Sequence, residues 1–232
     1  MAKILFIVSG ATYWVLKDGT RYATGYWAEE FANPYKILTD AGHEVVVATP
    51  NGVTPNVDMM SLRPSMAGGE QGALELEAII RSAEVMRRPL KLSDVRLEDY
   101  DAVYLPGGHG PMADLAVDPA VGRVLVAAND AGTIIAPFCH GPAALLSATL
   151  ADGTNAFAGR RLTVFTDEEE RTGGTGENTP WWVETALRDA GVVVESAAPW
   201  SDHVVVDGNL ITGQNPQSSA SVARRVLEAL AA

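Results

Sequence analysis

The stretch Ile4-Leu5-Phe6-Ile7-Val8, which ends at Ser9-Gly10, decides the fold of this chain. It is a continuous run of apolar residues, as is typical of a strand that is buried on both faces of a parallel sheet. A second run of this kind covers residues 44–49. Between the two runs, apolar side chains recur at helical spacing at Trp27, Phe31, Tyr35 and Leu38. The chain therefore begins as strand, helix and strand, and Gly42 lies where that helix should end.

The same alternation continues along the rest of the chain. Further elements are predicted at residues 102–105 (strand), 119–131 (helix), 133–138 (strand), 162–165 (strand), 181–190 (helix), 204–212 (hairpin) and 217–231 (helix). Such an order predicts a doubly wound, mostly parallel α/β sheet with helices on both faces. Pro34 is expected to kink or interrupt the first helix, because proline lacks the backbone N–H that a helix needs.

Residues 50–98 depart from this alternation. Residues 50–66 are rich in Pro, Asn, Gly and Ser without periodicity, which indicates a loop, and a helix is expected at about 73–88. The chain has 232 residues, which is within reach of one large α/β domain. We therefore expect a single domain over residues 1–232 with a small inserted loop-helix region at about 50–98.

Charge and hydropathy exclude several classes of function. The formal net charge of −12 and the pI near 4.7 would repel a phosphate backbone, and no basic stripe interleaved with aromatic residues counters this. Nucleic acid is therefore not an expected partner. The first apolar run is too short to span a membrane and is not followed by a signal cleavage site. We expect no membrane association and a cytoplasmic location.

Cys139 is the only cysteine, so an internal disulfide and a zinc site built on several thiolates are excluded. It lies in Phe138-Cys139-His140-Gly141-Pro142, directly after a predicted strand and before a predicted helix. This resembles the sharp turn that presents the nucleophile of many hydrolases. A lone cysteine is more often a buried core thiol, but a core position does not require His-Gly-Pro after it. We therefore predict an exposed nucleophile that the N-terminus of the helix at 141–147 partly ionises.

A glycine-rich loop, Pro106-Gly107-Gly108-His109-Gly110, follows the strand at 102–105. Its backbone N–H groups could form an oxyanion hole, although an ordinary glycine turn has the same appearance. His109 and His140 could each make only a backbone hydrogen bond. The four histidines and the nearby acids show no spacing typical of a metal site, so no metal is expected.

Acidic residues occur in two groups that could supply an acid-base partner. Glu29-Glu30 falls in the first helix, and Asp167-Glu168-Glu169-Glu170 follows a predicted strand. Both groups could simply be solvated surface, which is the usual role of a charge run. The residues alone do not choose between Glu29 and Glu30.

With these motifs together, nearly the whole chain resembles the PfpI-type superfamily of class I glutamine amidotransferase-like proteins, which has a flavodoxin-like fold. Within it the chain is most similar to the glyoxalase III branch, whose members include heat-shock chaperones and deglycases. The resemblance is carried by residues 24–30 with Pro34, by 105–110, by 136–142, and by the segment Asp207-Gly208-Asn209-Leu210-Ile211-Thr212-Gly213-Gln214-Asn215-Pro216.

The resemblance implies roles for individual residues. Cys139 matches the family's nucleophile, and the spacing to Gly25 and Pro34 selects Glu30 as its acid-base partner. His140 is expected to be oriented by an acid, for which Glu170 matches best and Asp167 or Glu169 are alternatives. Gly107, Gly108 and His140 are expected to bind the substrate oxyanion. The late His-x-Glu segment of true amidotransferases is missing, so glutamine hydrolysis is not expected.

The implied activity is a cofactor-independent glyoxalase, which converts methylglyoxal or a related α-oxoaldehyde plus water to a hydroxy acid, or a protein deglycase. The expected partners are therefore a small α-oxoaldehyde or a glycated substrate. Two alternatives stay open: a cysteine amidohydrolase or peptidase with the same turn, and a redox-responsive stress protein or holding chaperone. The resemblance also implies a homodimer.

Overall fold

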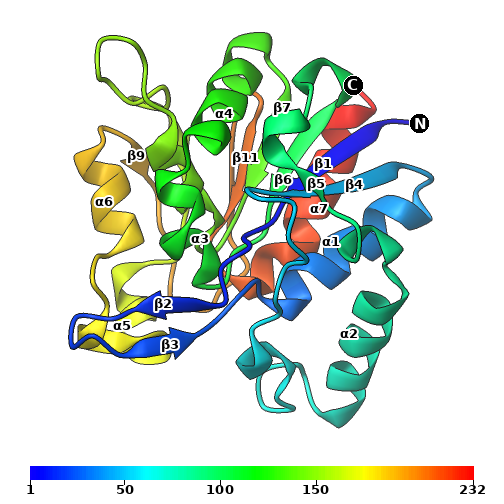
Figure 1. Ribbon diagram of the computed structural model, residues 1–232, viewed down its shortest axis with the longest axis vertical. Coiled ribbons are helices and arrows are strands. Elements are labelled where there is room, and N and C mark those ends of the chain that lie inside the picture. The colour runs from blue at the N-terminus through cyan, green and yellow to red at the C-terminus, as the bar shows by residue number, and fades with distance from the viewer.

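The computed structural model describes residues 1–232 (Figure 1). Its centre is a seven-stranded sheet in the order β10-β11-β7-β6-β1-β4-β5. Every neighbouring pair is parallel except β10 and β11, which form an antiparallel hairpin. The prediction of a mostly parallel sheet is confirmed. Its strands are β1 (Lys3–Ile7), β4 (Glu44–Thr49), β5 (Leu90–Lys91), β6 (Ala102–Leu105), β7 (Ile134–Pro137), β10 (Val204–Asp207) and β11 (Leu210–Gly213).

Helices cover the sheet on both sides, as predicted. The two long helices α1 and α7 pack against each other on one side, and α4 lies on the other, against β7 (Figure 1). None of the helices is both long and apolar enough to cross a membrane. The helices are α1 (Ala28–Asp40), α2 (Glu70–Ser82), α3 (Gly110–Ala113), α4 (Pro119–Ala131), α5 (Asp167–Gly173), α6 (Val183–Asp189) and α7 (Ser219–Leu230).

Local sequence explains where α4 begins and ends. The Asp118 carboxylate accepts hydrogen bonds from the N–H groups of Ala120 and Val121, which have no partner within the helix. Pro119 occupies the first helical position, where a missing N–H costs nothing. At the other end, Gly132 adopts a left-handed conformation with φ 70° and stops the helix. This gives α4 the bounds that the sequence predicted.

The core lies around the central strands. Residues Ile4 to Ile7 of β1 are fully buried, and the ring of Phe6 stacks on Tyr104 of β6 with 4.6 Å between ring centroids. Both faces of these strands are covered by helices, so the side chains on either face of the sheet must be apolar. The uninterrupted apolar run at the start of the chain follows from this burial.

Several predicted elements differ from the structure. The strand expected at 162–165 is wrong: only β8 (Arg161–Leu162) forms, and it pairs with β9 (Val193–Val194) in a separate two-stranded sheet. The ladder stops because the Thr163 N–H donates to the side chain of Thr212 rather than to a strand carbonyl. The helix expected at 73–88 ends at Ser82, before a short 3-10 turn. Pro34 does not interrupt α1.

A small hairpin lies between β1 and α1. Strands β2 (Tyr13–Val15) and β3 (Arg21–Ala23) are antiparallel. They extend from the sheet beside α5 in Figure 1. The tip contains Gly19, whose φ of 84° favours glycine. This hairpin carries Trp14, whose ring stacks on His109 with 5.5 Å between centroids.

The winding of the chain fixes where a ligand can bind. From β1 the chain passes outward to β4 and β5, then returns to β6 on the other side of β1 and continues to β7. In open α/β sheets, a ligand site lies outside the carboxyl ends of the strands where the winding reverses. Here those ends lead into the glycine loop at 106–110 and into Cys139.

Candidate active site

Cys139 lies two residues beyond the end of β7 in a left-handed backbone conformation, with φ 55°. This conformation is unfavourable for a residue with a side chain, and such strain is concentrated at functional sites. Neighbouring strands and loops hold it in place. The Cys139 N–H donates to the carbonyl of Gly213 at 3.0 Å, and its own carbonyl accepts from the Phe165 N–H at 3.0 Å. The predicted sharp turn at the cysteine is therefore present.

The expected exposure and ionisation of the thiol are wrong. Cys139 is only 3% exposed. Burial raises the pKa of the thiol well above its usual value, and the neighbouring Glu30 carboxyl raises it further. The segment Gly141–Ser147 is a short 3-10 helix, and its N-terminus does not offset the loss of solvent. The resting side chain is thus a neutral thiol.

Glu30 lies in the first turn of α1 and is fully buried. Its Oε2 accepts a hydrogen bond from the Gly107 N–H at 2.6 Å. Burial raises the pKa of Glu30 to about 8, although hydrogen bonds from the Cys139 thiol and from Gly107 lower it in part. Its Oε1 is buried without a hydrogen-bond partner in the protein. At neutral pH this carboxyl is mainly protonated.

The neighbouring Glu29 points elsewhere. It accepts a hydrogen bond from Asn33 one helical turn further along α1 and is only partly buried. It lines a surface groove between α1 and α2 together with Glu75. Burial separates the two glutamates: Glu30 reaches the thiol, and Glu29 faces the groove.

The glycine loop fits closely between the cysteine and the glutamate. A Cβ at position 107 would lie 2.9 Å from both Cys139 Cβ and Glu30 Oε2, so the two side chains flank Gly107. Gly108 has φ 83°, and a Cβ there would meet the Gly25 carbonyl at 2.5 Å. Both positions therefore require glycine.

The N–H groups of this region have different partners. The Gly107 N–H is already bound to Glu30. The Gly108 N–H is directed at the Cys139 sulfur, where it lowers the pKa of the thiol in part. The His140 N–H donates no hydrogen bond within the protein. The Gly108 N–H thus borders the sulfur, and the His140 N–H, whose nitrogen would lie 2.6 Å from a Cβ at position 107, is a second donor without a partner in the protein.

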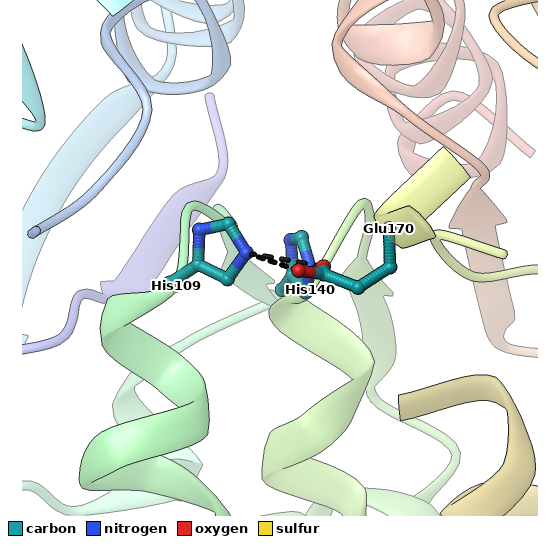
Figure 2. A group of neighbouring side chains, drawn as sticks. All are labelled: His109, His140 and Glu170. Atoms are coloured by element: carbon teal, nitrogen blue, oxygen red, sulfur yellow. Dashed lines mark hydrogen bonds and ion pairs between the residues drawn. The ribbon is translucent and has the colours of Figure 1, made fainter. Parts of the chain in front are cut away.

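His140, Glu170 and His109 form a buried hydrogen-bonded group (Figure 2). His140 Nδ1 lies 3.4 Å from the Cys139 sulfur, and its Nε2 lies 2.7 Å from Glu170 Oε2. His109 Nε2 lies 3.1 Å from each Glu170 oxygen. Figure 2 shows both imidazole rings directed at the one carboxylate. A single carboxylate is thus hydrogen-bonded to both histidines.

Charge states follow from this arrangement. Burial and the neighbouring His109 lower the pKa of His140, so its imidazole is neutral at rest. Burial alone would raise the pKa of Glu170, but hydrogen bonds from His109 and His140 outweigh it and hold the pKa well below its usual range. A neutral His140 that donates Nε2–H to Glu170 leaves Nδ1 unprotonated and facing the thiol.

Of the three acids considered for orienting His140, Glu170 makes this contact. Glu169 is fully buried but turns away toward Trp200 and Asn215. Asp167 accepts a hydrogen bond from Thr185 near the surface. Consecutive residues at the start of α5 point in different directions, which a charge run in the sequence does not reveal.

His109 was not selected from the sequence as a member of this group. Its contact with Glu170 joins the loop after β6 to helix α5, and the contact of His140 with the same carboxylate adds the turn after β7. One ligand atom from each of His109, His140 and Glu170 lies within 4.8 Å of the others. Two imidazoles and a carboxylate are a common ligand set for zinc, so these residues could hold a metal ion in place of their protons. No spacing along the chain indicated this possibility.

A small cavity of about 60 Å³ lies beside Cys139. At about 10–15 Å³ for each water-sized group, it accepts roughly four to six such groups. Met66, at the end of the predicted loop at 50–66, contributes to its wall. The complete lining is Trp27, Met66, Gly108, His109, Cys139, His140, Phe165, Gly173, Gly174, Trp200, Pro216 and Gln217.

Comparison with known proteins identifies relatives along the whole chain. Glyoxalase 3 from Candida albicans is 27% identical and is matched over 99% of this chain and 98% of the relative. The protein/nucleic acid deglycase HchA from Staphylococcus aureus is 29% identical, over 94% of this chain and 76% of the relative.

Solved structures are likewise similar to this chain over nearly its whole length. Glyoxalase III from Candida albicans superposes with a TM-score of 0.82 at 25% identity, over 98% of this chain and 97% of that one. Rapid Encystment Protein 24 KDa from Francisella tularensis gives a TM-score of 0.86 at 25% identity, over 99% of both chains. The DJ-1/PfpI family model matches residues 22–229. The chain therefore belongs to the DJ-1/PfpI family.

Proposed function

We propose that this protein is a cofactor-independent glyoxalase, which converts a small α-oxoaldehyde such as methylglyoxal plus water to the corresponding hydroxy acid. The observation that carries the proposal is the buried, protonated carboxyl of Glu30 beside the thiol of Cys139. Conversion of an α-oxoaldehyde to a hydroxy acid is an internal redox reaction, in which one carbon is oxidised and its neighbour reduced. It needs proton transfers between carbons, for which Glu30 is suited.

The first step is addition of sulfur to the aldehyde. His140 Nδ1, at 3.4 Å, takes the thiol proton while the sulfur forms a bond to the aldehyde carbon. Glu170 stabilises the resulting imidazolium through the hydrogen bond at 2.7 Å. The N–H groups of Gly108 and His140 stabilise the oxyanion that develops on the former carbonyl oxygen. Protonation of this oxygen completes a hemithioacetal.

The second step moves hydrogen between the two substrate carbons. The Glu30 carboxylate, formed once it has given its proton to the substrate oxygen, removes the C–H proton of the hemithioacetal carbon. The electron pair passes to the neighbouring carbonyl, whose oxygen takes the proton held by His140, and gives an enediol. Glu30 then gives its proton to the second carbon and takes the hydroxyl proton of the first, which leaves a thioester on Cys139 and a protonated Glu30. A pKa of about 8 suits this exchange near neutral pH.

Hydrolysis ends the cycle. Water, deprotonated by His140, attacks the thioester carbon; the C–S bond breaks and the sulfur takes the proton that His140 holds. The products are the hydroxy acid and the free thiol. Each proton that moves in these three steps is therefore given or taken by Cys139, Glu30 or His140.

A deglycase activity would use the same groups on the early adduct between an α-oxoaldehyde and an amine, as the name of the Staphylococcus aureus relative suggests. The cavity of about 60 Å³ favours the free aldehyde as the principal substrate. A glycated side chain would have to bring its reactive carbon past Met66 or Trp200.

The test is to incubate the thiol-free protein with methylglyoxal and to measure lactate. Wild type should form lactate, Cys139→Ala should form none, and Glu30→Gln should lose about 10²- to 10⁴-fold in rate. Absence of lactate from wild type, or undiminished lactate from Cys139→Ala, would refute the proposal. Amide and ester substrates complete the panel: release of amine that does not require Glu30 would favour a cysteine hydrolase instead.

A further inference from the structure

The segment between β9 and β10 contains a second strained residue. Trp200 has φ 63°, which is a left-handed conformation that a bulky side chain rarely adopts. Apart from Cys139, it is the only residue other than glycine with positive φ. Such a conformation persists only where the surrounding contacts enforce it.

The strained backbone places the indole of Trp200 on the wall of the cavity beside Cys139. A Cβ at Gly173 would lie 2.5 Å from this indole, so α5 packs directly against it. The indole also meets Phe165 edge-on at 5.5 Å between ring centroids, and the Phe165 ring lies 4.4 Å from the His140 ring. Trp200 is 37% exposed, so it stands between the cavity and solvent.

Glu169 enforces this position. It is fully buried, and its Oε1 accepts the Trp200 N–H at 2.7 Å. The same oxygen accepts from Asn215 Nδ2 at 2.8 Å and from Gln214 Nε2 at 3.2 Å, while Oε2 accepts the N–H and hydroxyl of Thr166. Five donors satisfy a buried carboxylate without a cation. Glu169 thus ties the Trp200 backbone to the amide side chains that follow β11 and to the start of α5.

Gln214 and Asn215 hold the chain on both sides of Trp200. Gln214 Oε1 accepts the Ala197 N–H at 2.8 Å, and Asn215 Nδ2 donates to the Ser201 carbonyl at 2.8 Å. These two residues belong to the Gly213-Gln214-Asn215-Pro216 segment, which has no role in the chemistry proposed above. Their contacts explain why an amide pair follows β11 at this point.

We propose that Trp200 determines which α-oxoaldehydes the site accepts, by limiting the size of the substituent on the carbonyl, and that Glu169 is the positioning residue that holds it there. This rests on the proposed function for the identity of the substrate. The site then takes α-oxoaldehydes with small aliphatic substituents and excludes those with an aromatic ring.

The test compares methylglyoxal with phenylglyoxal, which carries a benzene ring in place of the methyl group. In Trp200→Ala, the ratio of kcat/KM for phenylglyoxal to kcat/KM for methylglyoxal should rise at least about tenfold. Trp200→Phe retains an aromatic ring and serves as the second variant if Trp200→Ala does not fold. It should show a smaller rise in the same ratio. An unchanged ratio in both variants would overturn the proposal.

Glu169→Gln should shift the same ratio in the same direction, because an amide cannot accept all five hydrogen bonds. The matched control is Glu168→Gln, one residue earlier on α5 and exposed; it should leave the ratio and both rates at wild-type values. A fall in both rates by one common factor in Glu169→Gln would indicate a purely structural role and refute the positioning role.

Labelling of Cys139 tests, without catalytic turnover, whether Trp200 limits the size of the groups that can reach the thiol. Methyl methanethiosulfonate is small, whereas the aromatic disulfide of Ellman's reagent is bulky, and intact mass reports modification of Cys139 by each. Trp200→Ala should accelerate the bulky reagent about tenfold more than the small one. If wild type makes no lactate but Trp200→Ala still accelerates the bulky reagent more than the small one, the proposed glyoxalase function fails and the role of Trp200 in limiting access is supported. Equal acceleration of both reagents would overturn the role of Trp200.

Discussion

Replacement of Glu30 by Gln should make the protein progressively more stable relative to wild type as the pH rises, while it lowers activity by about 10²- to 10⁴-fold. The pKa of Glu30 is about 8 in the folded protein, against 4.5 when exposed. Between these values the folded state binds a proton that the unfolded state has released, so stability falls as pH increases. Stability from the protonated carboxyl is complete below pH 4.5 and is lost as the pH rises through 8.

The magnitude follows from the two pKa values. At about 1.4 kcal/mol per pKa unit, the shift from 4.5 to about 8 corresponds to about 5 kcal/mol in full. Because the carboxyl is half ionised in the unfolded protein at pH 4.5 and in the folded protein at pH 8, the wild type should lose about 4 kcal/mol of unfolding free energy between these two pH values. Gln cannot ionise, so Glu30→Gln escapes this loss. Its amide can still accept the Gly107 N–H, but one of its own N–H groups lacks an acceptor, which costs about 1–3 kcal/mol at every pH. That constant cost cancels when only the pH dependence is compared.

The assay is urea unfolding of wild type and variant at several pH values from 4.5 to 8, followed by tryptophan fluorescence. The difference in unfolding free energy should move steadily in favour of Glu30→Gln as the pH rises. Glu168→Gln, at an exposed position on α5, should follow the wild type. A difference that stays flat over this pH range would show that Glu30 is ionised in the folded protein and would refute the reasoning.

Three further predictions concern the loops around the thiol. Glu170→Gln should lower the rate of lactate formation by about 10²- to 10⁴-fold, because it removes the anion that stabilises a charged His140; a rate near wild type would contradict this role. Gly108→Ala should destabilise the fold by at least about 1–2 kcal/mol in urea unfolding, because φ is 83° and the new Cβ would meet the Gly25 carbonyl; unchanged stability would mean that the loop can move. Zn²⁺ should inhibit turnover and EDTA should restore it, since Zn²⁺ can replace the protons between the two histidines and Glu170. If Zn²⁺ inhibits His109→Asn as strongly as it inhibits wild type, the inhibitory ion binds elsewhere.

The sequence predicted those parts of the site that depend on strand ends. Carboxyl ends of parallel strands meet at one edge of the sheet, so apolar runs that end in Gly107-Gly108 and in Cys139 predict that these residues are neighbours. Glu30 needed the family resemblance, because Glu29 occupies the same helical turn. The structure separates the two by burial, which depends on how α1 packs against the rest of the chain.

The exposure of the thiol was mispredicted for a related reason. The residues that cover Cys139 include Met66 and Trp200, which come from irregular segments far from it in sequence. Irregular segments carry no periodic signal, so their final position depends on contacts such as that between Glu169 and the Trp200 backbone. The contact of His109 with Glu170 was missed because it joins the glycine loop after β6 to α5, 61 residues further along the chain.

The neutral, buried state of Cys139 has a consequence for the life of the protein in a cell. Peroxides and most electrophiles attack thiolates, and their rates fall steeply when a thiol keeps its proton. The only cysteine of this chain is therefore protected between turnovers, and it becomes a nucleophile when a carbonyl small enough to enter the cavity lies within reach of the sulfur while His140 accepts the proton. A scavenger of reactive aldehydes built in this way would survive the oxidative conditions that often accompany such aldehydes.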